Sequence, residues 1–325
     1  MRRPLVALTA TASVLALSAC GLNATEKSAG GGSGPYPLSV ENCGSEVTFD
    51  AAPERVVLLK SAAVPYLASL GVLDRVTARA GEYPRDYYDD ATWSALEDIP
   101  ALTGKTDTSG HLLVSKEVVI DQEPDLVLGE VDNLSRDTLG DVGIPLIEEP
   151  AMCAAGLDEP GFDDIVDQMT TYGKVFDRPE EAAAAGAEIE ARVASLTAEP
   201  AAERRTAAVL YPTVGGGVTY AYGTRSMAHP ILEAAGFENV FADTDERVFE
   251  VTPEELIGRD PDVLILLHSA GDPAQVAQAV TALPGAQSIA AVRDDNLMPL
   301  LFNYVEPPTP LALDGLEQVR ARFGS

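Results

Sequence analysis

Few side chains in this sequence have the type and spacing that catalysis or metal binding requires. The three histidines, His111, His229 and His268, include no pair at the spacing of a helical metal site, and no cysteine stands beside them. The sequence contains no GxSxG, HExxH or P-loop motif, and Gly215-Gly216-Gly217 is not followed by the Lys-Ser/Thr of a phosphate loop. We therefore expect a protein that is not an enzyme and that holds no metal ion or cofactor of its own.

Polar residues that follow buried strands are the first candidates for binding a ligand. Short apolar strands alternate with helices in residues 55–147, which predicts βαβ units and a parallel sheet. Ligands of such sheets lie outside the carboxyl ends of the strands. The candidate segments are therefore 60–61, 79–83, 129–133 and 149–152, which include Lys60, Arg79 and Tyr83. Lys60 and Arg79 also fit solvated loop charges, and that alternative stays open.

One unit of a capped helix, a tight turn and a buried strand occurs twice in the chain. In residues 252–267, Thr252 and Glu255 form a capping box, and the helix must end before Pro261. The apolar run that follows is typical of a strand covered on both faces. Residues 115–128 have the same order of cap, helix, acidic-Pro-Asp turn and strand. The repeat predicts two similar, Rossmann-like α/β lobes with central parallel sheets.

A single long helix is expected between the lobes. Residues 179–197 are rich in Ala, Glu and Arg, and a helix of this length extends about 27 Å. We expect a first lobe over residues 36–160, a helical linker over 161–200 and a second lobe over 201–325, with a ligand cleft between the lobes. Within the first lobe, residues 81–105 are expected to form a long polar and aromatic loop.

The N-terminus has the pattern of a secretory signal. Arg2 and Arg3 precede an apolar run, and Leu17-Ser18-Ala19-Cys20 resembles a bacterial lipobox. The run is too short to span a bilayer. We expect residues 1–19 to be a signal peptide and Cys20 to be the lipid-modified, palmitate-bearing first residue. Residues 20–35, which contain GGGSG, would then form a flexible tether.

The charge and the remaining cysteines restrict the partners and the compartment. The chain has 22 basic and 51 acidic residues and a net charge of −29, which opposes binding to nucleic acid. In an exported protein, Cys43 and Cys153 form an even pair that suggests a disulfide. Two unrelated buried thiols are the alternative.

Several segments, taken in order, resemble the helical-backbone substrate-binding lipoproteins of ABC importers, which bind ferric siderophores, haem or cobalamin. The segments are NCGSEVTFDAAPERVVLL, LASLGVLDRV, SKEVVIDQEPDLVLGE, HPILEAAGFENVF, TPEELIGRDPDVLIL and ALDGLEQV. The resemblance implies a monomeric lipoprotein at the extracytoplasmic face of the cell membrane. It would capture a small iron-siderophore complex between its lobes and deliver the complex to an ABC permease and its ATPase.

The resemblance also implies roles for individual residues. An acidic residue on each lobe would contact the permease. In the second lobe this residue would be Glu254. The alternative is that Glu254 only stabilises the N-terminus of its helix. In the first lobe the aligned residue is Asn133, so Asp132 or Asp137 would take this role. A bulky iron chelate would be held by Lys60 and His268, by arginines that pair with anionic oxygens and by an aromatic wall, namely Arg79, Arg225, Tyr83, Trp93, Tyr220, Tyr222 and Tyr304.

Haem is the alternative ligand. His111 stands in the loop before the first repeat helix, similar to haem-binding members with an axial histidine there. Tyr220, after the glycine turn, would supply the opposite axial ligand. An exposed loop histidine and a packed strand tyrosine are the other interpretation of these two residues.

Overall fold

The computed structural model describes residues 35–106, 112–197 and 204–324, and the fold below is that of these residues. The predicted signal peptide, most of the predicted tether and the predicted lipidation site at Cys20 lie outside them. His111 also lies outside them.

The first sheet is parallel throughout, as the alternation of strands and helices predicts. Its strand order is β5-β4-β3-β6-β7. The strands span Val56–Leu58 (β3), Val76–Ala80 (β4), Ala101–Thr103 (β5), Leu126–Leu128 (β6) and Leu146–Ile147 (β7). An antiparallel hairpin of β1 (Leu38–Asn42) and β2 (Ser45–Phe49) precedes them.

Short helices connect these strands. They are α1 (Val64–Ser69), α2 (Asp90–Asp98), α3 (Lys116–Ile120) and α4 (Arg136–Gly140). The expectation of a loop over residues 81–105 was wrong, because α2 and β5 lie inside it. The Asp89 carboxylate accepts a hydrogen bond from the Thr92 N–H at 2.7 Å, and this cap starts a helix in which only Leu96 is fully buried. Because only one residue of this helix is buried, its sequence lacks the regular apolar spacing by which a helix is recognised.

The second sheet has a parallel centre and an antiparallel edge. Its order is β11-β9-β8-β12-β13, and β10 also pairs with β8. The strands span Thr206–Pro212 (β8), Thr219–Tyr222 (β9), Glu238–Asn239 (β10), Val248–Val251 (β11), Val263–His268 (β12) and Leu297–Leu301 (β13). β9 is antiparallel to β8 because the short glycine-rich turn between them can only join antiparallel strands, and it is also antiparallel to β11.

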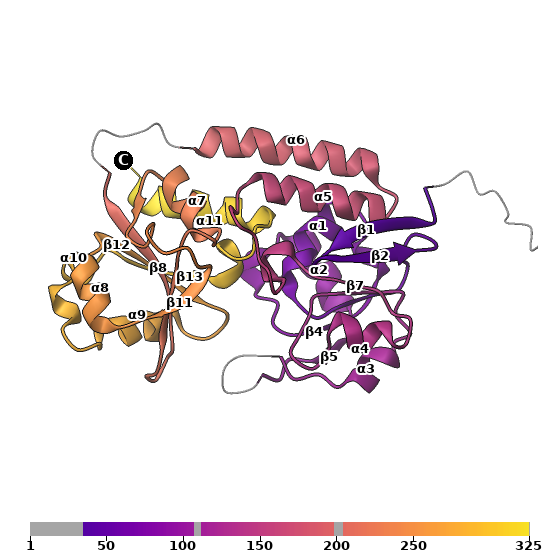
Figure 1. Ribbon diagram of the computed structural model, residues 1–325, viewed down its shortest axis with the longest axis horizontal. Helices are drawn as coiled ribbons and strands as arrows, with labels where there is room; N and C mark the ends of the chain where they lie inside the picture. The colour runs from indigo at the N-terminus through magenta and orange to yellow at the C-terminus, as the bar shows by residue number, and fades with distance from the viewer. Residues whose placement is uncertain (1–34, 107–111, 198–203, 325) are drawn as a thin grey trace, which may run out of the picture. The chain divides into compact units, whose positions relative to one another are not determined.

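Three longer helices form a layer. They are α5 (Asp163–Val175), α6 (Pro179–Leu196) and α11 (Pro310–Phe323). In this layer α6 packs against both of the others. The predicted linker helix is therefore present, as α6. Figure 1 shows α6 lying along α5 and extending toward α11. The second lobe also contains α7 (Ala228–Ala234), α8 (Pro253–Arg259), α9 (Pro273–Thr281) and α10 (Ala290–Arg293). Within the described ranges, no helix combines the length and apolar character that crossing a bilayer needs.

One apolar core runs through both lobes. It includes Leu58 of the first sheet, Tyr66 of α1, Tyr172 of α5, Leu313 of α11 and Val209 of the second sheet. Each sheet has a second, separate cluster on its other face. Both lobes lie within the compact unit Pro35–Ser325. The predicted fold class of two α/β lobes with a connecting helix is confirmed, whereas the exact lobe boundaries stay a prediction.

The contact between α5 and α6 depends on a glycine. A Cβ atom at Gly173 would lie 2.3 Å from the Ala182 Cβ and 3.1 Å from the Arg178 carbonyl oxygen. We predict that Gly173→Ala lowers the free energy of unfolding by about 1–3 kcal/mol, because overpacking must push the helices apart. Urea unfolding followed by circular dichroism measures this change. Gly258 is the matched control, since it is helical with nothing within 4 Å of its added Cβ. Gly258→Ala should stabilise by up to ~1 kcal/mol, and an equal loss in both variants would contradict the packing argument.

Candidate functional site

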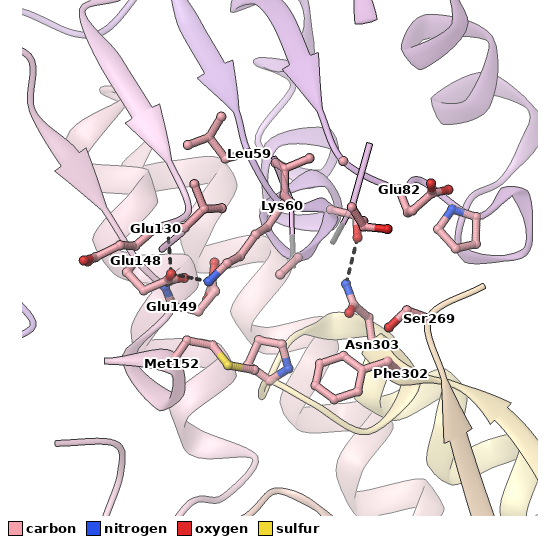
Figure 2. A pocket seen from close by; sticks show the side chains of 18 of the residues that line it. Leu59, Lys60, Glu82, Glu130, Glu148, Glu149, Met152, Ser269, Phe302 and Asn303 are labelled. Atoms are coloured by element: carbon pink, nitrogen blue, oxygen red, sulfur yellow. Dashed lines mark hydrogen bonds and ion pairs between the residues drawn. The ribbon is translucent and has the colours of Figure 1, made fainter. Parts of the chain in front are cut away.

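A cavity of about 450 Å³ lies between the carboxyl end of the first sheet and the second lobe. Such a volume is in the range of small-molecule sites. The first lobe contributes the residues that follow its strands, namely Leu59–Ala62, Gly81, Glu82, Pro84, Tyr87, Thr106, Leu112, Glu130–Asp132, Glu148, Glu149 and Met152. The second lobe contributes Ser269, Phe302, Asn303 and Pro307. Figure 2 shows Ser269, Phe302 and Asn303 facing Lys60 and Met152 across this space.

Glu148 is the centre of the polar network in the cavity wall. It follows β7 directly and is 1% exposed. One carboxylate oxygen, Oε2, accepts hydrogen bonds from the Lys60 ammonium and from the Glu130 backbone N–H at 2.7 Å. The other, Oε1, accepts from the Glu149 N–H at 2.8 Å. A buried carboxylate is tolerated when donors and a cation surround it, as they do here.

The side chain of Lys60 is held in one position by Gly129 and Glu148. It follows β3, and its ammonium and the Glu148 carboxylate form an ion pair with one buried and one partly exposed partner. A Cβ at Gly129 would lie only 3.0 Å from the Lys60 Cγ, and Gly129 has a φ of +96°. Glycine at this position therefore provides both the left-handed backbone and the space for the lysine stem. The result is a cation held at a fixed place in the cavity wall.

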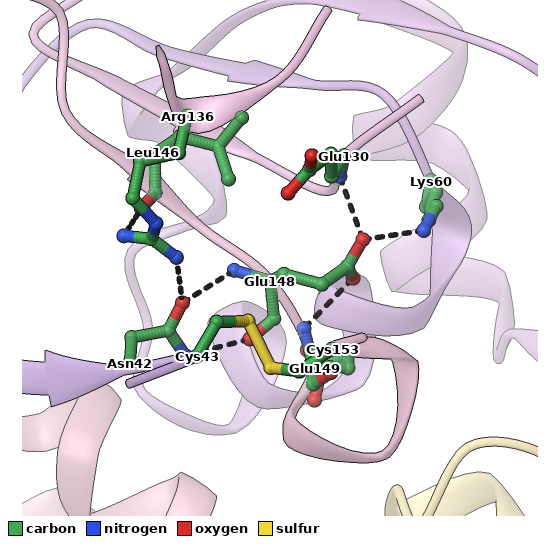
Figure 3. Close-up of a disulfide and its surroundings, with 9 residues drawn as sticks. All are labelled: Asn42, Cys43, Lys60, Glu130, Arg136, Leu146, Glu148, Glu149 and Cys153. Carbon is green, nitrogen blue, oxygen red and sulfur yellow. Dashed lines mark hydrogen bonds and ion pairs between the residues drawn. A yellow bond between two sulfur atoms is a disulfide. The ribbon is translucent and has the colours of Figure 1, made fainter. Parts of the chain in front are cut away.

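Asn42 fixes the backbone that carries Glu148. The Asn42 Oδ1 accepts from the Glu148 N–H at 2.9 Å, and the Asn42 amide donates to the Glu148 carbonyl oxygen at 2.8 Å. Arg136 also donates to Asn42 Oδ1, at 2.5 Å, and to the Leu146 carbonyl oxygen at 2.7 Å. Next to Asn42, Cys43 forms a disulfide with Cys153, with Cα atoms 5.3 Å apart. Figure 3 shows how this bond ties the β1–β2 hairpin to the segment after Glu149.

Glu149 is a buried carboxyl group in the cavity wall. Its Oε1 accepts a hydrogen bond from the Tyr172 hydroxyl at 2.8 Å, whereas its Oε2 is buried without a hydrogen-bond partner among the described residues. Burial raises the pKa of Glu149 to about 8, against the lowering effect of the Tyr172 hydrogen bond. The group is therefore largely protonated at neutral pH.

Hydrogen bonds across the cavity join the two lobes. The Asn303 backbone N–H donates to the Tyr87 hydroxyl at 2.8 Å, and its side-chain amide donates to the Ser61 Oγ at 3.0 Å. The Tyr304 hydroxyl donates to the Asp86 carbonyl oxygen. The two walls of the cavity are thus in direct contact at one edge.

The rule that ligands lie at strand ends identifies most of the first-lobe wall. Each of the four candidate segments contributes to it: 60–61 through Lys60 and Ser61, 79–83 through Gly81 and Glu82, 129–133 through residues 130–132, and 149–152 through Glu149 and Met152.

Several residues expected to contact a ligand have other neighbours in the first lobe. Arg79 and Tyr83 pack against each other, with the guanidinium carbon 5.1 Å from the ring centroid. The Arg79 Nε donates to the Leu96 carbonyl oxygen at 3.1 Å, and Tyr83 is buried. Trp93 stacks on Tyr88, with ring centroids 6.4 Å apart. None of Arg79, Tyr83 and Trp93 is among the residues that line the cavity.

The second-lobe candidates also lie outside the cavity lining. Tyr220 is exposed on β9, and Tyr222 on the same strand is buried. Arg225 binds the Asp158 carboxylate and lines a separate cavity of about 240 Å³. His268, at the end of β12, is buried with its Nδ1 3.3 Å from the Ala270 carbonyl oxygen. Tyr304 is buried at the contact between the lobes.

The three candidate docking acids are on the surface. Glu254 is exposed in the first turn of α8, and Asp132 and Asp137 are exposed near the start of α4. Asp132 also lines the cavity. Their contact with a permease stays a prediction.

Sequence reasoning missed Glu148, the most connected side chain of the site. Its position directly after an expected strand was the available signal, but the candidate segment began one residue later. Tyr87, Phe302 and Asn303 were not singled out either. Tyr87 follows the end of β4 only after several residues, so no strand-end rule reaches it.

A model of the periplasmic binding protein family matches residues 56–301, which is most of the chain. The chain belongs to this family. This chain is similar to one in the crystal structure of an ABC-type Fe³⁺-hydroxamate transport system from Saccharomonospora viridis. The two sequences are 53% identical, and the two structures superpose with a TM-score of 0.85. The alignment covers 89% of this chain and 100% of that chain.

More distant proteins are also similar to this chain. The periplasmic heme-binding protein RhuT from Roseiflexus is 20% identical with a TM-score of 0.63, over 84% of this chain and 98% of that chain. A cobalamin-binding protein of Halobacterium salinarum is 26% identical over 287 residues, which cover 85% of this chain and 71% of the relative. Members of this family are solute-binding proteins rather than enzymes.

Glu149 should make the stability of this binding protein depend on pH. Its folded pKa of about 8 lies above the usual 4.5, so the folded state holds a proton that the unfolded state releases. The stabilisation is full below about pH 4.5 and is lost as the pH rises through 8. We predict that Glu149→Gln flattens this fall, by a few kcal/mol at most.

Urea unfolding at several pH values between about 5 and 9 tests this prediction. Glu188→Gln, which removes an exposed carboxylate from α6, should leave the pH dependence of the wild type unchanged. If the free energy of unfolding falls with pH equally in the wild type and in Glu149→Gln, Glu149 is not the group that causes the fall.

The disulfide should stabilise the site as well as the fold. Cys43 and Cys153 are 110 residues apart in sequence, and closing so long a loop is worth ~4 kcal/mol in the chain-entropy model. We predict that the double variant Cys43→Ser/Cys153→Ser has a lower midpoint of urea unfolding. Reduction of the wild type with dithiothreitol should lower the midpoint equally and should not affect the double variant. An unchanged midpoint in both experiments would show that the bond adds no stability.

Proposed function

We propose that the protein captures a ferric hydroxamate siderophore in the cavity between its lobes and delivers it to an ABC permease. The observation that carries this proposal is the 53% identity to the Fe³⁺-hydroxamate transport system from Saccharomonospora viridis, over nearly the whole chain. The cavity supports it, because it is formed by both lobes and includes apolar and polar wall residues.

The chemistry of the wall suits a chelated metal. A hydroxamate siderophore surrounds its iron with oxygen atoms, so the protein binds the outer surface of the complex rather than the metal. Lys60 offers an ammonium to these oxygens. One N–H of this ammonium already donates to the Glu148 carboxylate, which holds the group in place. Phe302, Met152 and Leu59 offer apolar contacts for the hydrocarbon chains of the chelator.

Haem is the weaker candidate. Of its two proposed axial ligands, His111 lies outside the described residues, and Tyr220 is exposed on β9 rather than part of the cavity lining. No observation on the described residues favours haem over the hydroxamate complex.

Anchoring and delivery complete the proposal. Cleavage before Cys20 would leave a lipid-anchored protein on a tether of residues 20–35, at the outer face of the cell membrane. The folded body would then present Glu254 on one lobe and Asp132 or Asp137 on the other to the permease, which works with its own ATPase.

A binding screen tests the ligand. We predict that the ferric complex of desferrioxamine B quenches the fluorescence of Trp93 and the tyrosines, with a dissociation constant at or below ~1 µM, near −8 kcal/mol. Iron-free desferrioxamine B is the control and should quench less. Haemin, cobalamin, ferric citrate and a ferric catecholate complete the screen. Tight binding of haemin with a sharp Soret band, and none of ferric desferrioxamine B, would reject the proposal in favour of haem.

A further inference from the structure

The charges that line the cavity are strongly unequal. Among the described lining residues, the only cationic side chain is Lys60, and it is already paired with Glu148. The lining also includes the carboxyl groups of Glu82, Glu130, Asp132 and Glu149. Glu149 is largely protonated at neutral pH and adds little charge. Lys60 is already paired with Glu148 and cannot offset both Glu82 and Glu130, so these two residues give the described wall a negative potential.

Glu130 is the partly buried acid of the cavity lining. Its backbone N–H is used by Glu148, but its carboxylate forms no hydrogen bond or ion pair with any described residue. Burial, and then repulsion by Glu148, raises the pKa of Glu130, and these two effects outweigh the lowering of this pKa by Arg136 and Lys60. Both effects mean that a cation brought into the cavity would stabilise the ionised Glu130.

Glu149 is an independent sign of a missing partner. It lines the same cavity and is 4% exposed, yet its Oε2 has no hydrogen-bond partner in the described part of the chain. Buried polar atoms in folded proteins are nearly always paired with protein, water or ligand. The first-lobe wall thus has one buried polar atom without a protein partner; because Glu149 is largely protonated at neutral pH, this atom adds a hydrogen-bonding group rather than a negative charge.

The general acidity of the chain does not account for this arrangement by itself. A net charge of −29 spreads a negative field over the whole surface. Charges separated by more than about 8–10 Å are screened at physiological salt, whereas charges on the walls of a cleft are screened much less. Residues that line the cavity should therefore determine which ligand charge is preferred.

We propose that the cavity selects its ligand by charge and takes ferric hydroxamates that carry a protonated amine, with Glu130 as a specificity-determining residue. This inference rests on the proposed function. Glu82, exposed on another part of the same wall, acts in the same direction. Neutral hydroxamate complexes bind less tightly, and complexes with a free carboxylate bind least.

Three probes with one iron centre test the proposal. Desferrioxamine B ends in a primary amine, N-acetylation removes its charge, and N-succinylation replaces it with a carboxylate. The ferric complexes thus carry a positive charge, no charge and a negative charge. At low salt we expect the affinity of the wild type to fall along this series, by at least ~10-fold in total, which is 1.4 kcal/mol. Added salt should reduce the ratio.

Matched variants assign the effect to the cavity. Glu130→Gln keeps the shape of the side chain and should reduce the ratio between the cationic and anionic complexes at least ~3-fold, with a smaller change in the affinity for the neutral complex than for either charged complex. Glu82→Gln is a second variant at an exposed position and should reduce the ratio by a smaller amount. Glu188→Gln removes the same charge from the exposed face of α6 and should leave the ratio unchanged.

The possible outcomes separate this inference from the proposed function. Equal affinity of the wild type for all three complexes overturns the charge selection and leaves the hydroxamate function standing. An equal effect of Glu188→Gln and Glu130→Gln also overturns it, because the preference would then come from the general surface charge. Failure of all three complexes to bind overturns the proposed function and this inference together.

Discussion

The hydrogen bonds of Asn303 hold the two walls of the cavity at their separation. This residue follows β13 in the second lobe, yet it donates to Tyr87 and Ser61 of the first. Its segment is anchored by Glu306, whose buried carboxylate accepts from the Ser226 hydroxyl at 2.5 Å and the Met227 N–H at 2.9 Å. Because both ends of this connection are buried, opening the lobes at this edge would leave several polar groups unpaired, which is costly.

The apolar core shared by the two lobes also opposes their separation. Residues of helices α5, α6 and α11 and of both sheets belong to one apolar cluster, so the lobes cannot separate without exposing large side chains such as Tyr66 and Tyr172. The Tyr66 hydroxyl also donates to the Pro308 carbonyl oxygen at 3.0 Å, inside the same interface. A ligand that enters the cavity therefore meets walls whose positions are already set, which reduces the ordering cost of binding.

Within these fixed walls the charges are arranged in two layers. The inner layer is Glu148, which is buried and compensated by Lys60 and two backbone N–H groups. The outer layer is Glu82, Glu130 and Asp132, at positions that are partly or fully exposed. The inner layer explains how one lysine can stay at a fixed position in an acidic protein. The outer layer determines the electrostatic potential that an incoming molecule meets.

The sequence by itself determined many of the elements and their order, although not α2 and β5. Capping boxes, proline positions and apolar runs identified α6, α8, β6 and β12 because these signals act between residues close in the chain. The strand-end rule then located the first-lobe wall, since it depends only on the direction of a parallel strand.

Only the tertiary structure decided which side chains meet. Tyr222, Trp93 and Arg79 have the chemistry of ligand-binding residues, but packing directs them to partners outside the cavity lining, whereas Asn303 and Tyr87 meet across a large separation in sequence. The orientation of a side chain depends on contacts with residues distant in the chain, and a one-dimensional pattern does not contain those contacts.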